Sequence, residues 1–120
     1  MHKKECGADG EQKAADFLQK KGYTIVARNW RTRRGEIDII AEAGETVVFA
    51  EVKTLPSGNV QTLEKELGAL KQKRIVETAK CFLAEHRQYN ECYVRFDLIA
   101  LDMPGYEEIY HIENAFSETL

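Results

Sequence analysis

Two stretches decide the fold of this chain: Gly35-Glu36-Ile37-Asp38-Ile39-Ile40 and Val48-Phe49-Ala50-Glu51-Val52-Lys53. Each is rich in branched and aromatic apolar residues, which favour extended backbone. The glycine between them marks a turn. We therefore predict two strands, at 36–43 and 46–54, joined by the two-residue hairpin loop Gly44-Glu45 with glycine at a position of positive φ.

The two-residue loop sets the register of this hairpin. Asp38 then lies opposite Glu51, and Glu36 lies opposite Lys53, on one face of the two strands. Opposed residues have Cβ atoms about 4.5–5.5 Å apart, and like charges at that separation destabilise a sheet. A divalent cation such as Mg²⁺ or Mn²⁺ would remove the conflict, because it takes hard oxygen ligands. The alternative is a solvent-facing side with an ordinary Glu36–Lys53 ion pair. The other face is predicted to hold Ile37, Ile39, Ala41, Val48, Ala50 and Val52.

Capping residues and periodicity predict the remaining elements. Asp9 and Gly22 are the expected caps of a helix over 10–21. Further strands are expected at 23–28, 93–101 and 107–112. A second helix is expected within 62–87, with an apolar stripe of Leu67, Leu70, Ile75, Ala79, Phe82 and Leu83. This order is typical of the α/β class, with a mixed central sheet flanked by helices.

One residue on the first predicted helix is a candidate for the carboxylate face. Glu11 ends a helical stripe that is otherwise apolar. It either complements the positive end of its helix or, if that helix packs on the charged face of the hairpin, adds a third carboxylate. Lys71, on the second predicted helix, shares a stripe with positions 75, 78 and 82, and is either a solvated charge or a contact to nucleic acid.

A basic segment leads directly into the hairpin. Residues 20–34 carry six basic side chains and no acidic one, although the whole chain has a net charge of −3. Arginines with an interleaved aromatic residue suit contact with phosphates and stacking on bases. The sequence therefore predicts a nucleic-acid-binding surface, with a solvated charged loop as the alternative. Trp30 is more often a core residue than a stacking platform. The candidate contacts are Arg28, Arg31, Arg33, Arg34 and Lys71.

Length and composition limit the remaining possibilities. A chain of 120 residues is expected to form a single domain over 1–120. No apolar run approaches the ~18 residues that a membrane helix needs, and no secretory signal is recognised, so we expect a cytoplasmic protein. The three cysteines have no metal-binding spacing, which predicts neither a disulfide framework nor a zinc site.

The ordered motifs of this chain resemble those of the YraN-type family of small bacterial proteins. They are Gly10-Glu11 with Ala14, Ala15 and Leu18; Gly22-Tyr23; Arg28-Asn29-Trp30-Arg31; Gly35-Glu36-Ile37-Asp38; Glu51-Val52-Lys53; Arg95-Phe96-Asp97; and His111-Ile112-Glu113-Asn114-Ala115-Phe116. The resemblance implies a restriction-endonuclease-like fold of the PD-(D/E)xK superfamily, similar to archaeal Holliday-junction resolvases.

The same resemblance implies a site and an activity. Asp38, Glu51 and the Val52 carbonyl would hold Mg²⁺ or Mn²⁺, which polarises the scissile phosphate and lowers the pKa of the attacking water. Lys53 would orient that water or offset charge that develops on the phosphate. Glu11 matches the acid on the first helix of the family. The implied activity is hydrolysis of phosphodiester bonds in DNA, in preference to RNA, with branched or damaged DNA as the substrate.

Two other functions stay open at this stage. One is a nucleic-acid-binding or adaptor module that retains the nuclease fold without catalysis. The other is an interaction protein whose acidic segment 91–120, with seven acidic residues and one arginine, binds a basic partner. A junction resolvase would need two active sites, and hence a symmetric homodimer. One departure from the family is Thr54-Leu55-Pro56, where a basic residue often follows the Glu-x-Lys motif.

Overall fold

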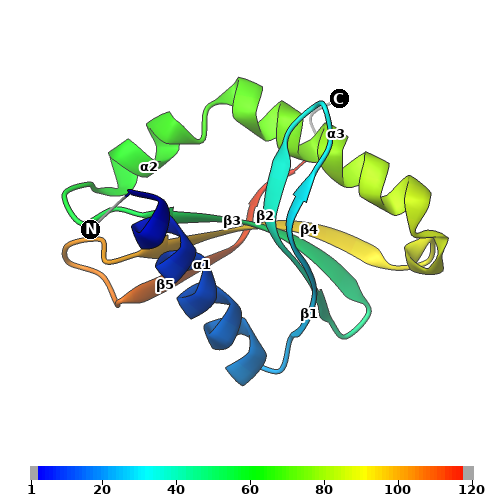
Figure 1. Ribbon diagram of the computed structural model, residues 1–120, viewed down its shortest axis with the longest axis horizontal. Helices are drawn as coiled ribbons and strands as arrows, with labels where there is room; N and C mark the ends of the chain where they lie inside the picture. The colour runs from blue at the N-terminus through cyan, green and yellow to red at the C-terminus, as the bar shows by residue number, and fades with distance from the viewer. Residues whose placement is uncertain (1–2, 118–120) are drawn as a thin grey trace.

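A mixed five-stranded sheet forms the centre of the molecule (Figure 1). The computed structural model describes residues 3–117, with side chains from residue 9 onward. Parallel pairing joins the third and fourth strands, and every other neighbouring pair is antiparallel. The predicted α/β class with a mixed sheet is confirmed. The strands, in their order across the sheet, are β1 (Thr24–Arg31), β2 (Glu36–Ala43), β3 (Thr46–Thr54), β4 (Tyr93–Leu101) and β5 (Ile109–Phe116).

Helices cover both faces of this sheet (Figure 1). α1 (Lys3–Lys20) packs on one face through Ala14, Ala15 and Leu18, and we call the apolar residues there the α1-side cluster. α2 (Val60–Glu66) and α3 (Ala69–Glu85) cover the other face, whose α3-side cluster includes Phe49, Phe82 and Phe96. The short 3-10 helix η1 (Arg87–Tyr89) leads into β4. Within residues 3–117, no helix is long and apolar enough to cross a membrane.

The β2–β3 hairpin has the bounds and the register predicted from its two-residue loop. Gly44 has a φ of 61°, a conformation that glycine adopts without steric cost. The paired residues are Ala43–Thr46, Glu42–Val47, Ala41–Val48, Ile40–Phe49 and Ile39–Ala50. Beyond the last of these pairs, the Asp38 carboxylate accepts a hydrogen bond from the N–H of Val52 at 2.8 Å. A side chain therefore takes the place of a backbone partner where the two strands separate.

The first helix begins earlier than predicted. The structure starts α1 at Lys3, so Asp9 lies inside the helix and the prediction that it caps the N-terminus is wrong. Residues 3–9 contain no proline, and α1 therefore continues through Gly10, which is buried against the sheet. The predicted C-terminal cap is confirmed, because Gly22 has a φ of 96° and the N–H of Tyr23 donates to the Leu18 carbonyl at 3.0 Å.

The helix predicted within 62–87 is present as α3, but a separate helix, α2, precedes it, with a break between the two. Gly68 has extended backbone (φ −69°, ψ 171°), which ends one helix and starts the next. Asn59 and Thr62 form the capping box that starts α2. The break moves Leu70 out of the predicted apolar stripe, and 61% of its surface is exposed.

Strict alternation fails near the start of β2. Ile37 packs in the α3-side cluster, whereas Ile39 packs in the α1-side cluster, so the prediction that both share a face is wrong. The neighbouring strand β1 changes face at the same level. Arg28 reaches α1, Trp30 packs on α3, and Asn29 between them has a φ of 52°. A residue with positive φ in an edge strand turns the side chains that follow it toward the other face of the sheet. Strict alternation of faces along a strand does not predict this change.

The edge strands are longer or shifted relative to the sequence prediction. β1 continues to Arg31 because it stays paired with β2 as far as Glu36. β5 runs to Phe116 rather than ending at 112, and its pairing with β4 shifts between Phe96 and Leu98. The second half of β5 contains polar residues, so a pattern based on hydrophobicity does not predict that the strand continues beyond 112.

Candidate functional site

Asp38 and Glu51 meet where β2 and β3 separate. They line a half-open hollow of about 310 Å³ between the hairpin and the first turns of α3. The predicted juxtaposition of two carboxylates on one face is therefore observed, and the two carboxyl groups share a hydrogen bond. The residues that line the hollow are Gly35, Glu36, Asp38, Glu51, Lys71, Arg74 and Ile75.

The Asp38 carboxyl group holds a proton more tightly than an exposed aspartate does. Burial, the charge of Glu51 and their shared hydrogen bond raise the pKa of Asp38 from 3.8 to about 8, with a smaller contribution from the charge of Glu11. The hydrogen bond from the N–H of Val52 acts in the opposite direction. Near neutral pH, Asp38 therefore largely keeps its proton. A cation bound there would favour the ionised form of Asp38.

Lys71 lies against the second carboxylate. Its Nζ atom is 2.5 Å from Oε2 of Glu51, whose side chain is only 6% exposed. Burial lowers the pKa of Lys71, but the hydrogen bond and charge of Glu51 raise it by more, so the ammonium stays charged. Lys53 and Asp38 also lie close enough to act on this pKa. The structure thus brings four of the predicted site residues together.

α1 carries Glu11, whose charge makes a small contribution to the raised pKa of Asp38. Glu11 is not among the residues that line the hollow. Gly10 explains how the helix comes so close to the sheet, because a Cβ atom built there would lie 2.6 Å from Oγ1 of Thr54. Thr54 directly follows Lys53, so this close approach holds the middle of α1 beside the end of β3.

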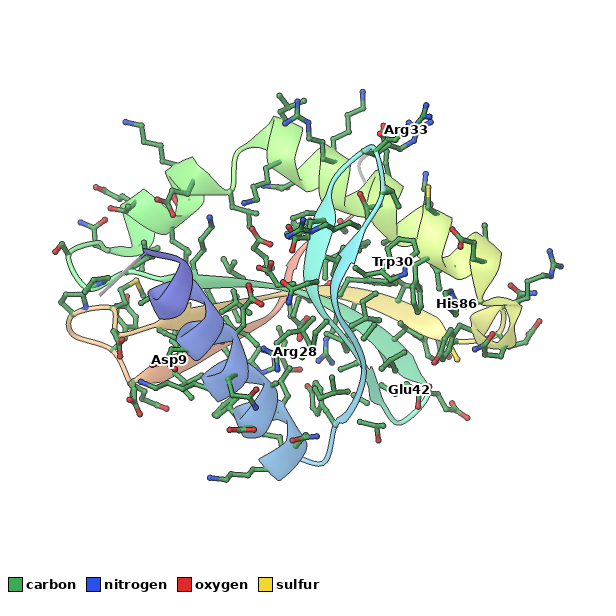
Figure 2. The ribbon with its side chains drawn as sticks, in the orientation of Figure 1. Asp9, Arg28, Trp30, Arg33, Glu42 and His86 are labelled. Atoms are coloured by element: carbon green, nitrogen blue, oxygen red, sulfur yellow. The ribbon has the colours of Figure 1, made fainter. Side chains whose placement is uncertain are left out.

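Three of the four predicted arginines lie together at the turn between β1 and β2. Arg31 contacts Glu36 at 3.4 Å, and Arg34 contacts Glu77 of α3 at 3.2 Å. Arg33 lies at the tip of the hairpin (Figure 2). We call Arg31, Arg33 and Arg34 the basic surface. Arg34 joins it to α3, and Arg31 joins it to Glu36, which lines the hollow.

A glycine sets the distance between this turn and α3. A Cβ atom built on Gly35 would lie 3.2 Å from Oγ1 of Thr78 and 3.6 Å from Cβ of Arg74. Thr78 is itself buried and donates its hydroxyl hydrogen to the Arg74 carbonyl at 2.7 Å. Because Gly35 and Arg74 both line the hollow, this close packing shapes its wall.

The other members of the basic segment lie elsewhere. Arg28 donates from Nη1 to Oε1 of Gln12 on α1 at 2.7 Å, on the opposite face of the sheet from α3, so the structure does not bring it together with the other arginines (Figure 2). Trp30 packs edge to face on Phe82, with ring centroids 5.3 Å apart. The core interpretation of Trp30 is therefore confirmed.

A second polar cluster was not identified as a site from the sequence. Asp97 is fully buried on β4 and accepts four hydrogen bonds, two from Arg95, one from His111 and one from the N–H of Asn114. Burial alone would raise the pKa of Asp97, but the hydrogen bonds from His111, Arg95 and Asn114 outweigh it and hold the pKa below its usual range. Arg95 also donates to the Tyr23 hydroxyl at 2.6 Å. All acceptor positions of the Asp97 carboxylate are filled, and its hydrogen bonds link β4 to β5 while Arg95 extends the network to Tyr23, just after α1. This geometry fits a structural role.

The carboxylate site fits a magnesium or manganese ion that keeps most of its water ligands. Two carboxylates with mutual repulsion are the donor set that Mg²⁺ uses in proteins, together with water and substrate oxygens. Across the part of the chain with described side chains, no group of three or more His, Cys, Asp and Glu residues is placed to hold a metal ion, so the protein would supply two carboxylates at most here. Cys81 and Cys92 are free thiols, and Cys6 lies outside the described side chains.

Comparison with known proteins supports the resemblance drawn from the motifs. The profile of the family described as "Uncharacterised protein family UPF0102" matches residues 10–101. A UPF0102 protein of Treponema pallidum is 47% identical over 121 residues, covering 98% of this chain and 96% of the relative. Those of Treponema denticola and Geobacter metallireducens are 45% and 42% identical, covering 93% and 97% of this chain and 95% of each relative.

Proposed function

The chain belongs to the UPF0102 family, the YraN-type family of the sequence resemblance, and from this premise we propose that it is a metal-dependent nuclease that hydrolyses phosphodiester bonds in DNA. The observation that carries the proposal is the meeting of Asp38 and Glu51 in a hollow that also holds Lys71 and adjoins Lys53. Buried like charges cost stability, and a functional site is a common reason for a fold to retain them.

Each residue of the site has a chemical role in this proposal. Asp38, Glu51 and the Val52 carbonyl would hold Mg²⁺ or Mn²⁺, and the ion would supply Lewis-acid chemistry at the scissile phosphate. Lys53 orients the attacking water and offsets negative charge that develops on the scissile phosphate. Glu11 adds negative charge on the side of α1 and helps to keep the site selective for cations.

The basic surface supplies the contacts to the substrate. Arg31, Arg33 and Arg34 present guanidinium groups next to the hollow, and guanidinium groups bind phosphate through paired hydrogen bonds. A DNA strand whose backbone crosses these arginines passes the carboxylates. Arg28 contacts α1 instead, so we expect it to contribute less to DNA binding than the other three do.

Four finer expectations belong to the same proposal. DNA is the substrate in preference to RNA, and branched or damaged DNA in preference to intact duplex. Cutting two strands of a junction requires two copies of the site, and we expect a symmetric homodimer for that activity. The protein acts in the cytoplasm.

Cleavage assays on matched variants test the proposal. Labelled single-stranded, duplex, flap and four-way-junction DNA is incubated with Mg²⁺ or Mn²⁺ and with wild type, Asp38→Asn or Glu45→Gln. Asp38→Asn keeps the size of the side chain and removes its charge, whereas Glu45→Gln removes one carboxylate from the exposed loop at the far end of the same hairpin. We expect cleavage by wild type and Glu45→Gln and none by Asp38→Asn. Equal cleavage by wild type and Asp38→Asn would refute the catalytic role.

A second function, nucleic-acid binding without cleavage, is favoured by a different observation. Glu51 already has a charged partner in Lys71, and a lysine and an arginine, Lys71 and Arg74, line the hollow together with its carboxylates. A binding module would retard DNA equally in Mg²⁺ and in EDTA, would cut no member of the panel, and would bind DNA as well after Asp38→Asn as before.

A further inference from the structure

The ion pair between Lys71 and Glu51 covers the position at which the second carboxylate would bind a cation. Nζ of Lys71 is 2.5 Å from Oε2 of Glu51. A cation bound to the same oxygen would lie within a few ångströms of the ammonium, where two positive charges repel strongly in a partly buried site. The ammonium and the divalent cation therefore compete for one oxygen.

The two side chains differ in their freedom to move apart. The Glu51 side chain is 6% exposed and lies on β3 within the sheet, whereas the Lys71 side chain is 39% exposed and lies in the first turn of α3. Four methylene groups let a lysine ammonium swing into solvent without movement of its backbone. If either partner leaves, it is Lys71.

We propose that Lys71 is a built-in competitor of the divalent cation, which neutralises Glu51 in the metal-free protein and must withdraw before Mg²⁺ or Mn²⁺ binds. The inference rests on the proposed function, because it assumes that Asp38 and Glu51 form the metal site. It adds a regulatory property to that site. The affinity for the cation stays low until another negatively charged group pairs with the Lys71 ammonium. A phosphate of a bound strand is the group that the location favours, since Lys71 lines the same open hollow. Metal and DNA then bind cooperatively.

Direct measurement of metal binding tests this role without reference to cleavage. Mn²⁺ and Mg²⁺ are titrated calorimetrically into the full chain without DNA, for wild type, Lys71→Met and the control Lys73→Met. Lys73 carries the same charge two positions along α3 and is exposed, so its replacement reproduces the general change in charge but not the loss of a competitor. We expect Lys71→Met to bind the cation about tenfold more tightly, equivalent to about 1.4 kcal/mol, and Lys73→Met to differ from wild type by about twofold or less.

The possible outcomes separate the inference from the proposed function. Tighter binding by Lys71→Met alone supports the inference. Unchanged or weaker binding by Lys71→Met, with metal still bound by wild type and lost in Glu51→Gln, refutes the competition and leaves the metal site in place. Binding by neither wild type nor Lys71→Met refutes both. Circular dichroism and melting curves in EDTA identify any variant that is unfolded, and Lys71→Gln repeats the measurement with a polar side chain in that case.

Discussion

Replacing Asp38 by asparagine should stabilise the protein, and more so as the pH rises. Asparagine retains an oxygen that can accept the hydrogen bond from the N–H of Val52, and an amide that can donate to Glu51. What disappears is the need to hold a second negative charge in the hollow. The substitution therefore removes a cost that wild type incurs only when Asp38 ionises.

The size of the effect follows from the raised pKa of Asp38. An acid whose pKa is higher in the folded state than in the unfolded state stabilises the fold while it is protonated. The stabilisation by Asp38 is therefore complete below pH 3.8, its ordinary pKa, and is lost as the pH rises through about 8, its pKa in the folded protein. Between pH 5 and pH 8 the limit is about 4 kcal/mol, at about 1.4 kcal/mol per unit. Because the site relaxes when Asp38 ionises, we expect a gain of about 2 kcal/mol for Asp38→Asn at pH 8 relative to pH 5.

Melting curves in EDTA measure this difference directly. A gain of about 2 kcal/mol corresponds to a rise in Tm of roughly 10 °C for a domain of this size. The control Glu45→Gln removes a carboxylate from the exposed end of the same hairpin and should show no comparable dependence on pH. If Asp38→Asn and wild type melt with the same difference at pH 5 and pH 8, Asp38 does not titrate as the geometry requires, and the reasoning is wrong.

Three further predictions follow from contacts outside this pair. Asp97→Ala should lower the free energy of unfolding by about 3–5 kcal/mol in urea titrations, because it leaves Arg95 without its buried partner; a loss below 1 kcal/mol would show that water replaces the carboxylate. Gly10→Ala should cost about 1–3 kcal/mol through overlap with Thr54, and combining it with Thr54→Ala should recover most of the loss, whereas additive losses would place the strain elsewhere. Arg33→Ala should weaken retardation of DNA in gels and reduce the slope of log affinity against log salt by about one; an unchanged slope would remove this arginine from the phosphate contacts.

The carboxylate site could be predicted from the sequence because its two members lie on one hairpin. A two-residue loop with glycine at positive φ sets the register, and the register brings Asp38 toward Glu51. The structure differs from the predicted register in one respect. Asp38 lies just beyond the last paired residues, and its carboxylate accepts a hydrogen bond from the Val52 N–H. The rest of the site depends on helices whose positions no local pattern specifies.

The sequence by itself determined the hairpin, the cap at Gly22, the class of fold and the pairing of two carboxylates, because these depend on residues close together in the chain. Tertiary structure alone decided which charges meet across long separations. Packing of α3 on the sheet brings Lys71 to Glu51, and the crossing of α1 separates Arg28 from the arginines at the hairpin tip. Backbone conformation depends on residues that are neighbours in the sequence. The partner of a buried charge depends instead on how whole helices and strands pack, because that packing decides where water is excluded.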